Sequence, residues 1–266
     1  MKASYETVIA PTMVYRVSRS AEPRVLPAWG HILGSDRGRY DDPLDVYRVL
    51  YTSTSPTGAL IEALADLRPR YDRITEIAMI SDEQEEYEPA YLALVERARA
   101  AMAARLAARY LSGIEIVDRK PRFVDLGAGS SRSQIELDLR LGRLKVGDFT
   151  GRDRNLSRQA SRAVFNAGFA GLVAPSAEDA HAHTVAIFET ARDSNAFGVH
   201  LDVITTGFAD VDREAAAAAT ATLLGTGKYS GLVCPELGEE ENVDAASSQS
   251  LEGHLASAFE DPLLAA

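Results

Sequence analysis

The stretch VLYTSTSPTGALIEAL, residues 49–64, predicts a β-strand that leads directly into an amphipathic helix. Its first residues are β-formers within a run where apolar and polar side chains alternate, as expected for a strand. Ser55 and Pro56 follow, and this pair is typical of a helix start, because serine caps free N–H groups and proline suits the first turn. Beyond them, apolar side chains recur at helical spacing and form one stripe: Leu60, Ala63, Leu64 and Leu67.

The other patterns mix strands and helices without a regular order. Strands are expected at residues 12–19, 74–81, 114–117, 122–126, 170–176, 183–189 and 199–208. Helices are expected at residues 86–111, 133–144, 155–168 and 212–225. Because strict βαβ alternation is missing, the sequence predicts an α+β fold with a mixed or split antiparallel sheet and flanking helices.

The composition restricts the class of protein. The 266 residues are 46% hydrophobic, which is enough for one large domain or two small ones. The formal net charge of −11 would repel phosphate backbones, so we expect no direct binding to nucleic acid. The single cysteine, Cys234, excludes an internal disulfide. No long apolar run and no signal-peptide pattern occur, so we expect no membrane span and a cytoplasmic protein.

Residues 123–132, FVDLGAGSSR, look like a strand that enters a glycine-rich, nucleotide-binding turn. Methyltransferases that use S-adenosylmethionine carry such a loop, in which small residues bring a helix N-terminus close to the ligand. Here the third small position of the dinucleotide fingerprint is missing, and Asp148, at the spacing of the ribose-binding acid, follows a poor strand. We favour a simple strand-to-helix connection. The methyltransferase remains an alternative, and it predicts a parallel sheet with Gly127 and Gly129 at the mouth of a pocket.

Four short blocks of the chain resemble, in order, the RES domain family, which is named for its Arg, Glu and Ser. The blocks are VYRV with Arg16, GRY with Arg39 and Tyr40, VLYTSTSPTGALIEAL with Tyr51 and Glu62, and GFAGLVAPS with Ser176, followed by the strand HTVAIFE. The likeness covers residues 12–190 in pieces. After Ser176 the sequence departs from the family, because Ala177 stands where Arg is frequent. A catalytically inactive, RES-like binding module is therefore a second alternative.

The resemblance implies a fold similar to the ADP-ribosyltransferases of the diphtheria-toxin type. It also implies an enzyme that cleaves the nicotinamide–ribose bond of NAD, as the toxins of several toxin–antitoxin pairs do. The acceptor would be water, phosphate or a protein side chain. NAD would be the substrate, with no separate cofactor and no metal. The usual partner of such toxins is a small helix-turn-helix antitoxin that covers the active site, and a homodimer is also left open.

The chemistry of these residue types agrees with the resemblance. Arginine forks bind phosphate bidentately, so Arg16 and Arg39 would hold the diphosphate of NAD. Cleavage builds positive charge on the ribose, which the carboxylate of Glu62 would stabilise. One of two tyrosines would stack on the nicotinamide ring, and Ser176 would bond the ribose or the amide. The catalytic candidates are thus Glu62 and Arg39, and the substrate-binding candidates are Arg16, Tyr40, Tyr51 and Ser176.

The resemblance also divides the chain into two parts. Residues 1–192 are expected to form the RES-like domain, with a helical insertion at about residues 71–120. Residues 193–266 are expected to be a C-terminal extension of unknown role, with an acidic tail from about residue 236. An active enzyme requires that the candidate side chains converge on one cleft.

Overall fold

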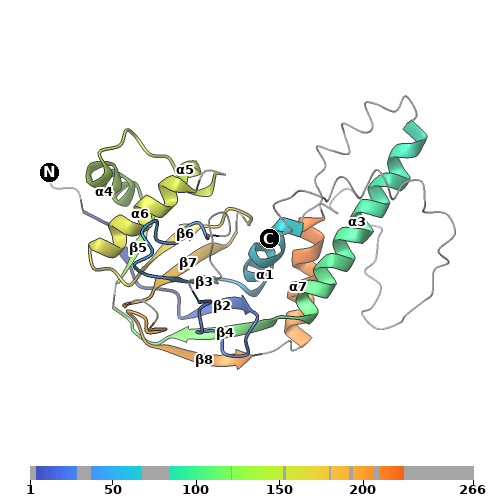
Figure 1. Ribbon diagram of the computed structural model, residues 1–266, viewed down its shortest axis with the longest axis horizontal. Helices are drawn as coiled ribbons and strands as arrows, with labels where there is room; N and C mark the ends of the chain where they lie inside the picture. The colour runs from blue at the N-terminus through green and yellow to red at the C-terminus, as the bar shows by residue number, and fades with distance from the viewer. Residues whose placement is uncertain are drawn as a thin grey trace.

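The computed structural model describes the chain in eight segments, which together contain the whole sheet and the helices around it. These segments are residues 4–28, 37–67, 84–120, 122–151, 154–179, 181–191, 194–206 and 210–224. Within them the protein has the predicted α+β class, with an eight-stranded sheet that curls strongly along its length (Figure 1).

The sheet is almost entirely antiparallel. Its strands, in chain order, are β1 (Thr7–Val8), β2 (Met13–Ser18), β3 (Val49–Ser53), β4 (Tyr110–Ile116), β5 (Phe123–Asp125), β6 (Gly171–Pro175), β7 (His183–Phe188) and β8 (Leu201–Thr206). Their spatial order is β1-β5-β6-β7-β3-β2-β4-β8. Only the short β5–β6 pair is parallel among these neighbours. The predicted mixed sheet is therefore confirmed.

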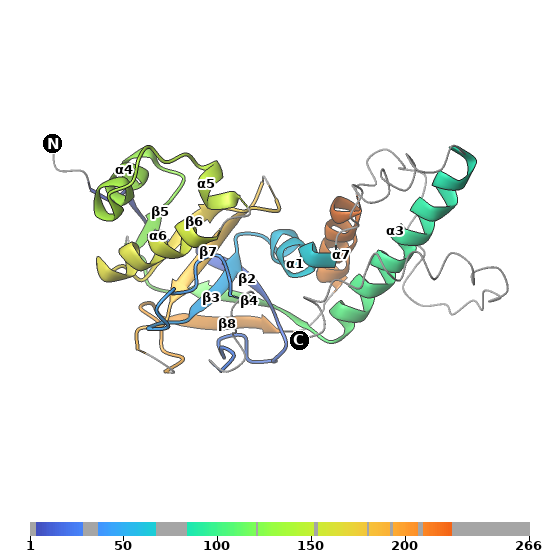
Figure 2. The same ribbon diagram turned by 45° about the horizontal axis from the view of Figure 1, so that its top comes forward.

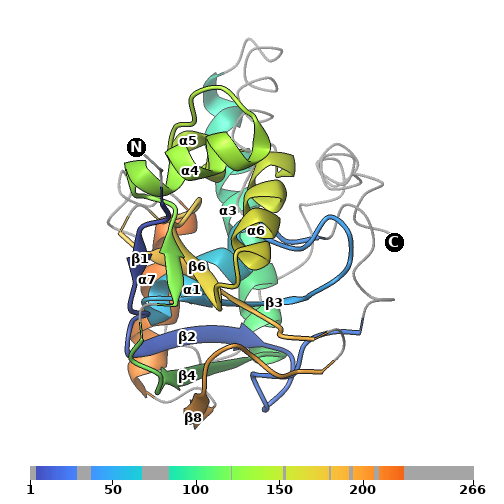
Figure 3. The same cartoon turned by 90° about the vertical axis from the view of Figure 1, so that its left-hand side faces the viewer.

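The helices gather in two groups at opposite ends of the sheet (Figure 2). One group consists of α4 (Gly129–Leu139), α5 (Gly147–Thr150) and α6 (Asn155–Asn166). The other consists of α1 (Pro56–Leu64) with the 3-10 turn η3 (Ala65–Leu67), α3 (Gln84–Ala107) and α7 (Asp210–Leu223). In Figure 3, α4 and α5 lie above β6, α6 lies beside it, and β2, β4 and β8 lie below.

The strand–helix unit at residues 49–64 forms as predicted, with β3 followed directly by α1. The Oγ of Ser55 accepts a hydrogen bond of 2.9 Å from the backbone N–H of Gly58, so the serine caps the helix. A Cβ atom on Gly58 would lie 2.6 Å from the Oγ of Ser53, so only glycine lets the helix start this close to β3. Leu60, Ile61 and Leu64 are buried and anchor the helix.

The core consists of three apolar clusters, and strand β7 shows how the sheet divides two of them. Ala186 and Phe188 face the cluster under α4, α5 and α6, whereas Val185 and Ile187 face the cluster on the opposite side. This alternation follows from the two-residue period of a strand, and both faces of β7 are buried. The third cluster joins α1, α3 and α7.

Segments of the expected insertion and extension take part in the sheet and the core. Residues 110–116, placed in the helical insertion, form β4, which pairs with both β2 and β8 inside the sheet. Strand β8 and helix α7, placed in the C-terminal extension, complete the sheet and the third cluster. The fold therefore continues well past residue 192, because β4 would otherwise be an unpaired edge. The strand expected at 74–81 and the acidic tail from residue 236 lie outside the described residues.

A helix that crosses a bilayer must be about 20 residues long and mostly apolar. In the part of the chain that the structure describes, no helix is both long enough and apolar enough to cross a membrane.

Candidate active site

A cleft of about 400 Å³ opens between α1, β2, β3 and the loop that precedes β3. Five of the six candidate side chains line it: Arg16, Arg39, Tyr40, Tyr51 and Glu62. Ser176, the sixth, lies directly behind Glu62 and is hydrogen-bonded to it. The convergence that an active enzyme requires is therefore present. Three further charged residues line the cleft and were not foreseen from the sequence: Asp66, Arg154 and Glu178.

Arg16 projects from strand β2 into the floor of the cleft. Its Nη1 donates a hydrogen bond of 3.0 Å to the backbone oxygen of Tyr51, while its buried Nε has no partner among the described residues. Burial lowers the pKa of Arg16 to about 10, so the guanidinium stays charged at neutral pH. Within the described residues no carboxylate forms an ion pair with Arg16, which leaves this cation available to an anionic ligand.

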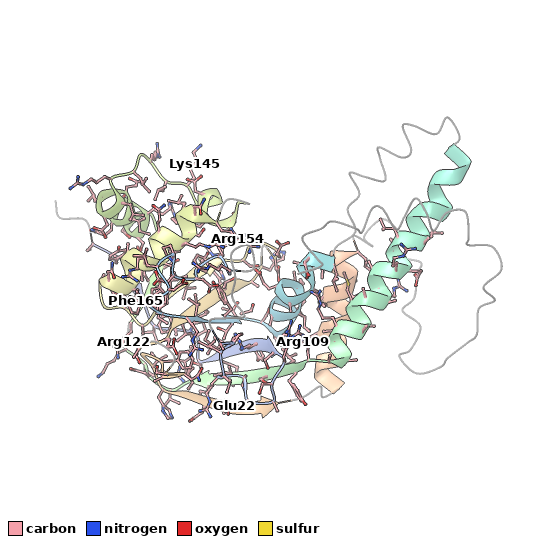
Figure 4. All side chains as sticks on the ribbon, viewed as in Figure 1. Glu22, Arg109, Arg122, Lys145, Arg154 and Phe165 are labelled. Carbon is pink, nitrogen blue, oxygen red and sulfur yellow. The ribbon has the colours of Figure 1, made fainter. Side chains whose placement is uncertain are left out.

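Arg39 is held by the backbone at the end of α5. Its Nη1 donates to the backbone oxygens of Phe149, at 3.1 Å, and Gly151, at 2.6 Å. These two bonds fix the guanidinium at the cleft although they use only one of its nitrogens. Arg154, at the start of α6 (Figure 4), also lines the cleft and donates to the backbone oxygen of Arg37 at 3.1 Å. Arg39 and Arg154 thus come from different loops and line the same cleft.

Tyr40 and Tyr51 have different roles in the structure. The Oη of Tyr51 accepts a bond of 2.8 Å from the N–H of Tyr40 and donates one of 2.9 Å to Asp41. The hydroxyl end of Tyr51 is therefore occupied in holding the loop. The Oη of Tyr40 is buried and has no partner among the described residues, and burial raises the pKa of this phenol, so it stays a donor at neutral pH.

The loop that carries Arg39 and Tyr40 is closely packed against Tyr51. A Cβ atom on Gly38 would lie 2.3 Å from the Oη of Tyr51, so this position has no room for a side chain. The N–H of Gly38 donates to Asp41 at 2.5 Å, and this carboxylate thus bonds both the loop and the tyrosine. Burial raises the pKa of Asp41, whereas these two hydrogen bonds act in the opposite direction.

Glu62 points from α1 into the cleft and is fixed by the segment after β6. The Oγ of Ser176 donates a bond of 2.5 Å to its Oε1, and the N–H of Ala177 also donates to it. The same Oγ accepts from the N–H groups of Glu178, at 3.1 Å, and Asp179, at 3.0 Å. Ser176 is therefore a positioning residue, since its contacts determine where the carboxylate of Glu62 lies.

The environment of Glu62 raises its pKa above the ordinary value for glutamate. The largest cause is burial by the surrounding protein, and the negative charge of Glu178 acts in the same direction. The hydrogen bond from Ser176 and the positive charge of Arg39 oppose the shift. Glu62 nonetheless reaches the open part of the cleft, where its side chain is exposed to small molecules. A carboxylate with these neighbours is suited to stabilise a developing cation.

The glycine-rich turn at 123–132 lies outside this cleft. Its polar groups bond within the turn: the N–H of Gly127 donates to Asp125 at 2.7 Å, and Arg132 donates to the backbone oxygen of Gly127. Neither Gly127 nor Gly129 lines the cleft, and β5 has one parallel neighbour rather than a parallel sheet around it. The parallel sheet that the methyltransferase alternative predicts is therefore wrong, and its two glycines do not lie at this cleft. The favoured interpretation, a strand-to-helix connection, is confirmed.

The fold and the cleft define an α+β protein whose arginines and an anchored glutamate converge on one site. The sequence model of the RES domain family matches residues 13–208 of this chain. The chain therefore belongs to the RES domain family. This match ends at residue 208, beyond strand β8, and so includes part of the segment that was expected to be an extension.

Two further comparisons were made with known proteins. No curated protein matches the chain. Among solved structures, the chain is similar to the crystal structure of the M. tuberculosis MbcT–MbcA toxin–antitoxin complex. The two are 16% identical in sequence, the likeness covers 79% of this chain and 92% of that chain, and the TM-score is 0.47.

Proposed function

We propose that this protein is an enzyme that consumes NAD by cleaving the bond between nicotinamide and ribose. The observation that supports the proposal most strongly is the anchored carboxylate of Glu62 facing the guanidinium of Arg39 across one cleft. Membership of the RES domain family agrees with it. In an inactive binding module, by contrast, nothing would require that Glu62 be held this firmly.

The arginines would bind the diphosphate of NAD. Arg39 and Arg154 lie along one wall of the cleft and Arg16 lies in its floor, so phosphate oxygens would meet donors from two directions. The Nε of Arg16 has no partner within the described segments, and a phosphate or ribose oxygen would satisfy it. The buried hydroxyl of Tyr40 likewise has no partner within those segments, and it suits a hydroxyl or amide oxygen of the substrate.

Glu62 would act while the glycosidic bond breaks. The ribose then gains positive charge, as in glycoside cleavage, and a nearby carboxylate stabilises that charge. The hydrogen bond from Ser176 holds Glu62 in place before the reaction, so no reorganisation is needed when the charge appears. The electron pair of the broken bond neutralises the pyridinium ring, and nicotinamide leaves uncharged. A general acid is therefore not needed for the leaving group.

The same proposal includes a biological role as the toxin of a toxin–antitoxin pair. Loss of NAD would stop the growth of the cell that makes the enzyme, so a partner would have to restrain it. We expect this partner to be a small helix-turn-helix protein that covers the cleft, as the resemblance to the family implies. NAD is then the substrate and not a bound cofactor.

Release of nicotinamide from NAD by the purified full-length chain tests the proposal. The wild-type protein is expected to release nicotinamide, and Glu62→Gln is expected to reduce the rate by at least about a hundredfold, in the range for loss of a positioned charge. Glu115→Gln is a matched control, because Glu115 lies on β4, outside the cleft, and pairs with Arg119 at the surface. Equal rates for the two variants would refute the role of Glu62, and no release by the wild type would refute NAD cleavage.

A further inference from the structure

Helix α6 and its N-cap present a row of three arginines to the loop that precedes β3. Arg154, Arg158 and Arg162 recur every four residues, so their side chains leave the same face of the helix. Arg154 donates to the backbone oxygen of Arg37 at 3.1 Å, and Arg162 donates to the buried carboxylate of Asp42 at 2.7 Å. The described part of this loop contains turns but no strand or helix, so side chains supply partners that its carbonyl groups would otherwise find in a ladder.

Arg158, the middle arginine of this row, bonds two consecutive carbonyl groups of the loop. Its Nε donates to the backbone oxygen of Gly38 at 3.2 Å, and its Nη2 donates to that of Arg37 at 2.8 Å. Both bonds are partly buried, and the charged donor makes them stronger than bonds between neutral groups. The guanidinium fork therefore fixes the two peptide units that lead directly into Arg39.

The segment from Gly38 to Tyr40 is also held beyond Arg39 and from the sheet. The buried Oγ of Ser161, on α6, donates to the backbone oxygen of Tyr40 at 2.7 Å. From β3, Tyr51 packs against Gly38, and its hydroxyl accepts from the N–H of Tyr40. Arg39 therefore lies between backbone groups that α6 and β3 hold, and both Arg39 and Tyr40 line the cleft.

Arg158 itself does not line the cleft, so it acts on a substrate only through the loop. Its charge has a second effect there. Burial raises the pKa of Asp41, and the positive charge of Arg158 opposes that shift. Since the carboxylate of Asp41 bonds both the N–H of Gly38 and the hydroxyl of Tyr51, Arg158 favours the charged form that holds the loop.

We propose that Arg158 is a positioning residue for substrate binding: it fixes the loop so that the guanidinium of Arg39 and the hydroxyl of Tyr40 are in place before the substrate arrives. This inference rests on the proposed cleavage of NAD and names a residue that sets the affinity for it. A binding group that is already held in its bound conformation loses less conformational entropy on binding, so preorganisation increases affinity. Glu62 is held by Ser176 instead, so the bond-breaking step should depend less on Arg158.

The position of Arg39 also affects the titration of Glu62. Burial is the largest cause that raises the pKa of Glu62, and the charge of Glu178 adds to this shift, whereas the hydrogen bond from Ser176 and the positive charge of Arg39 oppose it. A loosened loop would hold Arg39 less closely, so the pKa of Glu62 should rise. The acidic limb of the pH–rate profile should then move to higher pH, an effect that a general loss of stability does not produce.

Steady-state kinetics of nicotinamide release by the full-length chain test the inference. Arg158→Gln removes the fork and is expected to raise the KM for NAD about tenfold, the factor for one hydrogen bond to a charged group, while kcat changes less than about threefold. Arg158→Lys keeps a positive charge but offers a single nitrogen, so it should recover only part of the loss. Arg143→Gln is the matched control, because Arg143 is exposed between α4 and α5 and lies outside the cleft. Calorimetric titration with NAD gives the Kd of the same four proteins.

The outcomes separate the role of Arg158 from the proposed function. An unchanged KM in Arg158→Gln, or a fall in kcat alone, would overturn the inference and leave NAD cleavage intact. An acidic limb that stays in place would also overturn it, as would full recovery in Arg158→Lys, since charge alone would then suffice. If the wild type bound NAD without releasing nicotinamide, the proposed function would fail, and an unchanged Kd in Arg158→Gln would overturn the positioning role separately. A wild type that neither binds nor cleaves NAD would refute both.

Discussion

Replacing Tyr51 by phenylalanine tests whether the tyrosine hydroxyl holds the arginine-bearing loop in place. The change removes a bond of 2.9 Å to the carboxylate of Asp41 and one of 2.8 Å from the N–H of Tyr40, and it leaves both partners without that contact. A hydrogen bond to a charged group contributes about 1.5–3 kcal/mol and a neutral one about 0.5–1.5 kcal/mol, so the free energy of unfolding should fall by about 2–4.5 kcal/mol.

The dependence on pH makes this prediction specific. The hydrogen bond from Tyr51 lowers the pKa of Asp41. The stability that this bond contributes is therefore present while the carboxylate is charged, and it is lost as the pH falls through the pKa of Asp41. Tyr47→Phe is a control, because Tyr47 is a fully buried tyrosine whose hydroxyl bonds the neutral Oγ of Ser161 at 2.8 Å. That loss should be about 0.5–1.5 kcal/mol at every pH.

Urea unfolding of the wild type and both variants, at neutral and at acidic pH, measures these differences. Tyr51→Phe should lose more stability than Tyr47→Phe at neutral pH, and the gap should narrow in acid. The variant should also bind NAD more weakly, because Arg39 and Tyr40 belong to the loosened loop. If Tyr51→Phe lost less than about 0.5 kcal/mol at neutral pH, or if the two variants behaved alike at both pH values, the hydroxyl would not hold the loop as described.

Three further substitutions test the contacts of Glu178, Glu189 and Gly38. In Glu178→Gln the pKa of Glu62 should fall, because a like charge is removed; a pH–rate profile of nicotinamide release should then show its acidic limb at lower pH than in the wild type. Glu189→Ala should reduce the free energy of unfolding by about 3–5 kcal/mol in urea titrations, because it leaves the buried guanidinium of Arg48 without its carboxylate. Gly38→Ala should lower the unfolding midpoint and weaken NAD binding measured by calorimetry, since its Cβ would collide with Tyr51; an unchanged variant would show that the loop moves freely.

The sequence predicted local elements well because their signals are local. The cap at Ser55 and the helices α1 and α6 depend on residues a few positions apart, and the structure confirms these elements, although only Leu60 and Leu64 of the predicted stripe are buried. The pairing of strands depends instead on distant segments. β4 follows a long helix in the sequence, yet it pairs with β2 and β8. No pattern within residues 110–116 predicts which strands it pairs with.

The cleft was only partly predictable for a similar reason. Arg39 reaches the backbone of Gly151 and Ser176 reaches Glu62, and each of these contacts joins residues more than a hundred positions apart. The ordered family blocks supplied those residues, whereas their contacts came only from the fold. Arg154 lies in a polar, glycine-containing loop, where an arginine is ordinarily a surface residue. Its place in the cleft depends on how α6 packs, which its own segment does not reveal.

The glycine-rich turn and the cleft differ in how some of their polar groups are satisfied. In the turn, the N–H of Gly127 donates to Asp125 and its backbone oxygen accepts from Arg132, so both backbone polar groups of Gly127 have partners. In the cleft, the Nε of Arg16 and the Oη of Tyr40 are buried and lack partners among the described residues. Leaving a buried donor without a hydrogen bond costs free energy of folding. A bound polar ligand would satisfy both donors, so these two groups support the proposed binding role of the cleft independently of family membership.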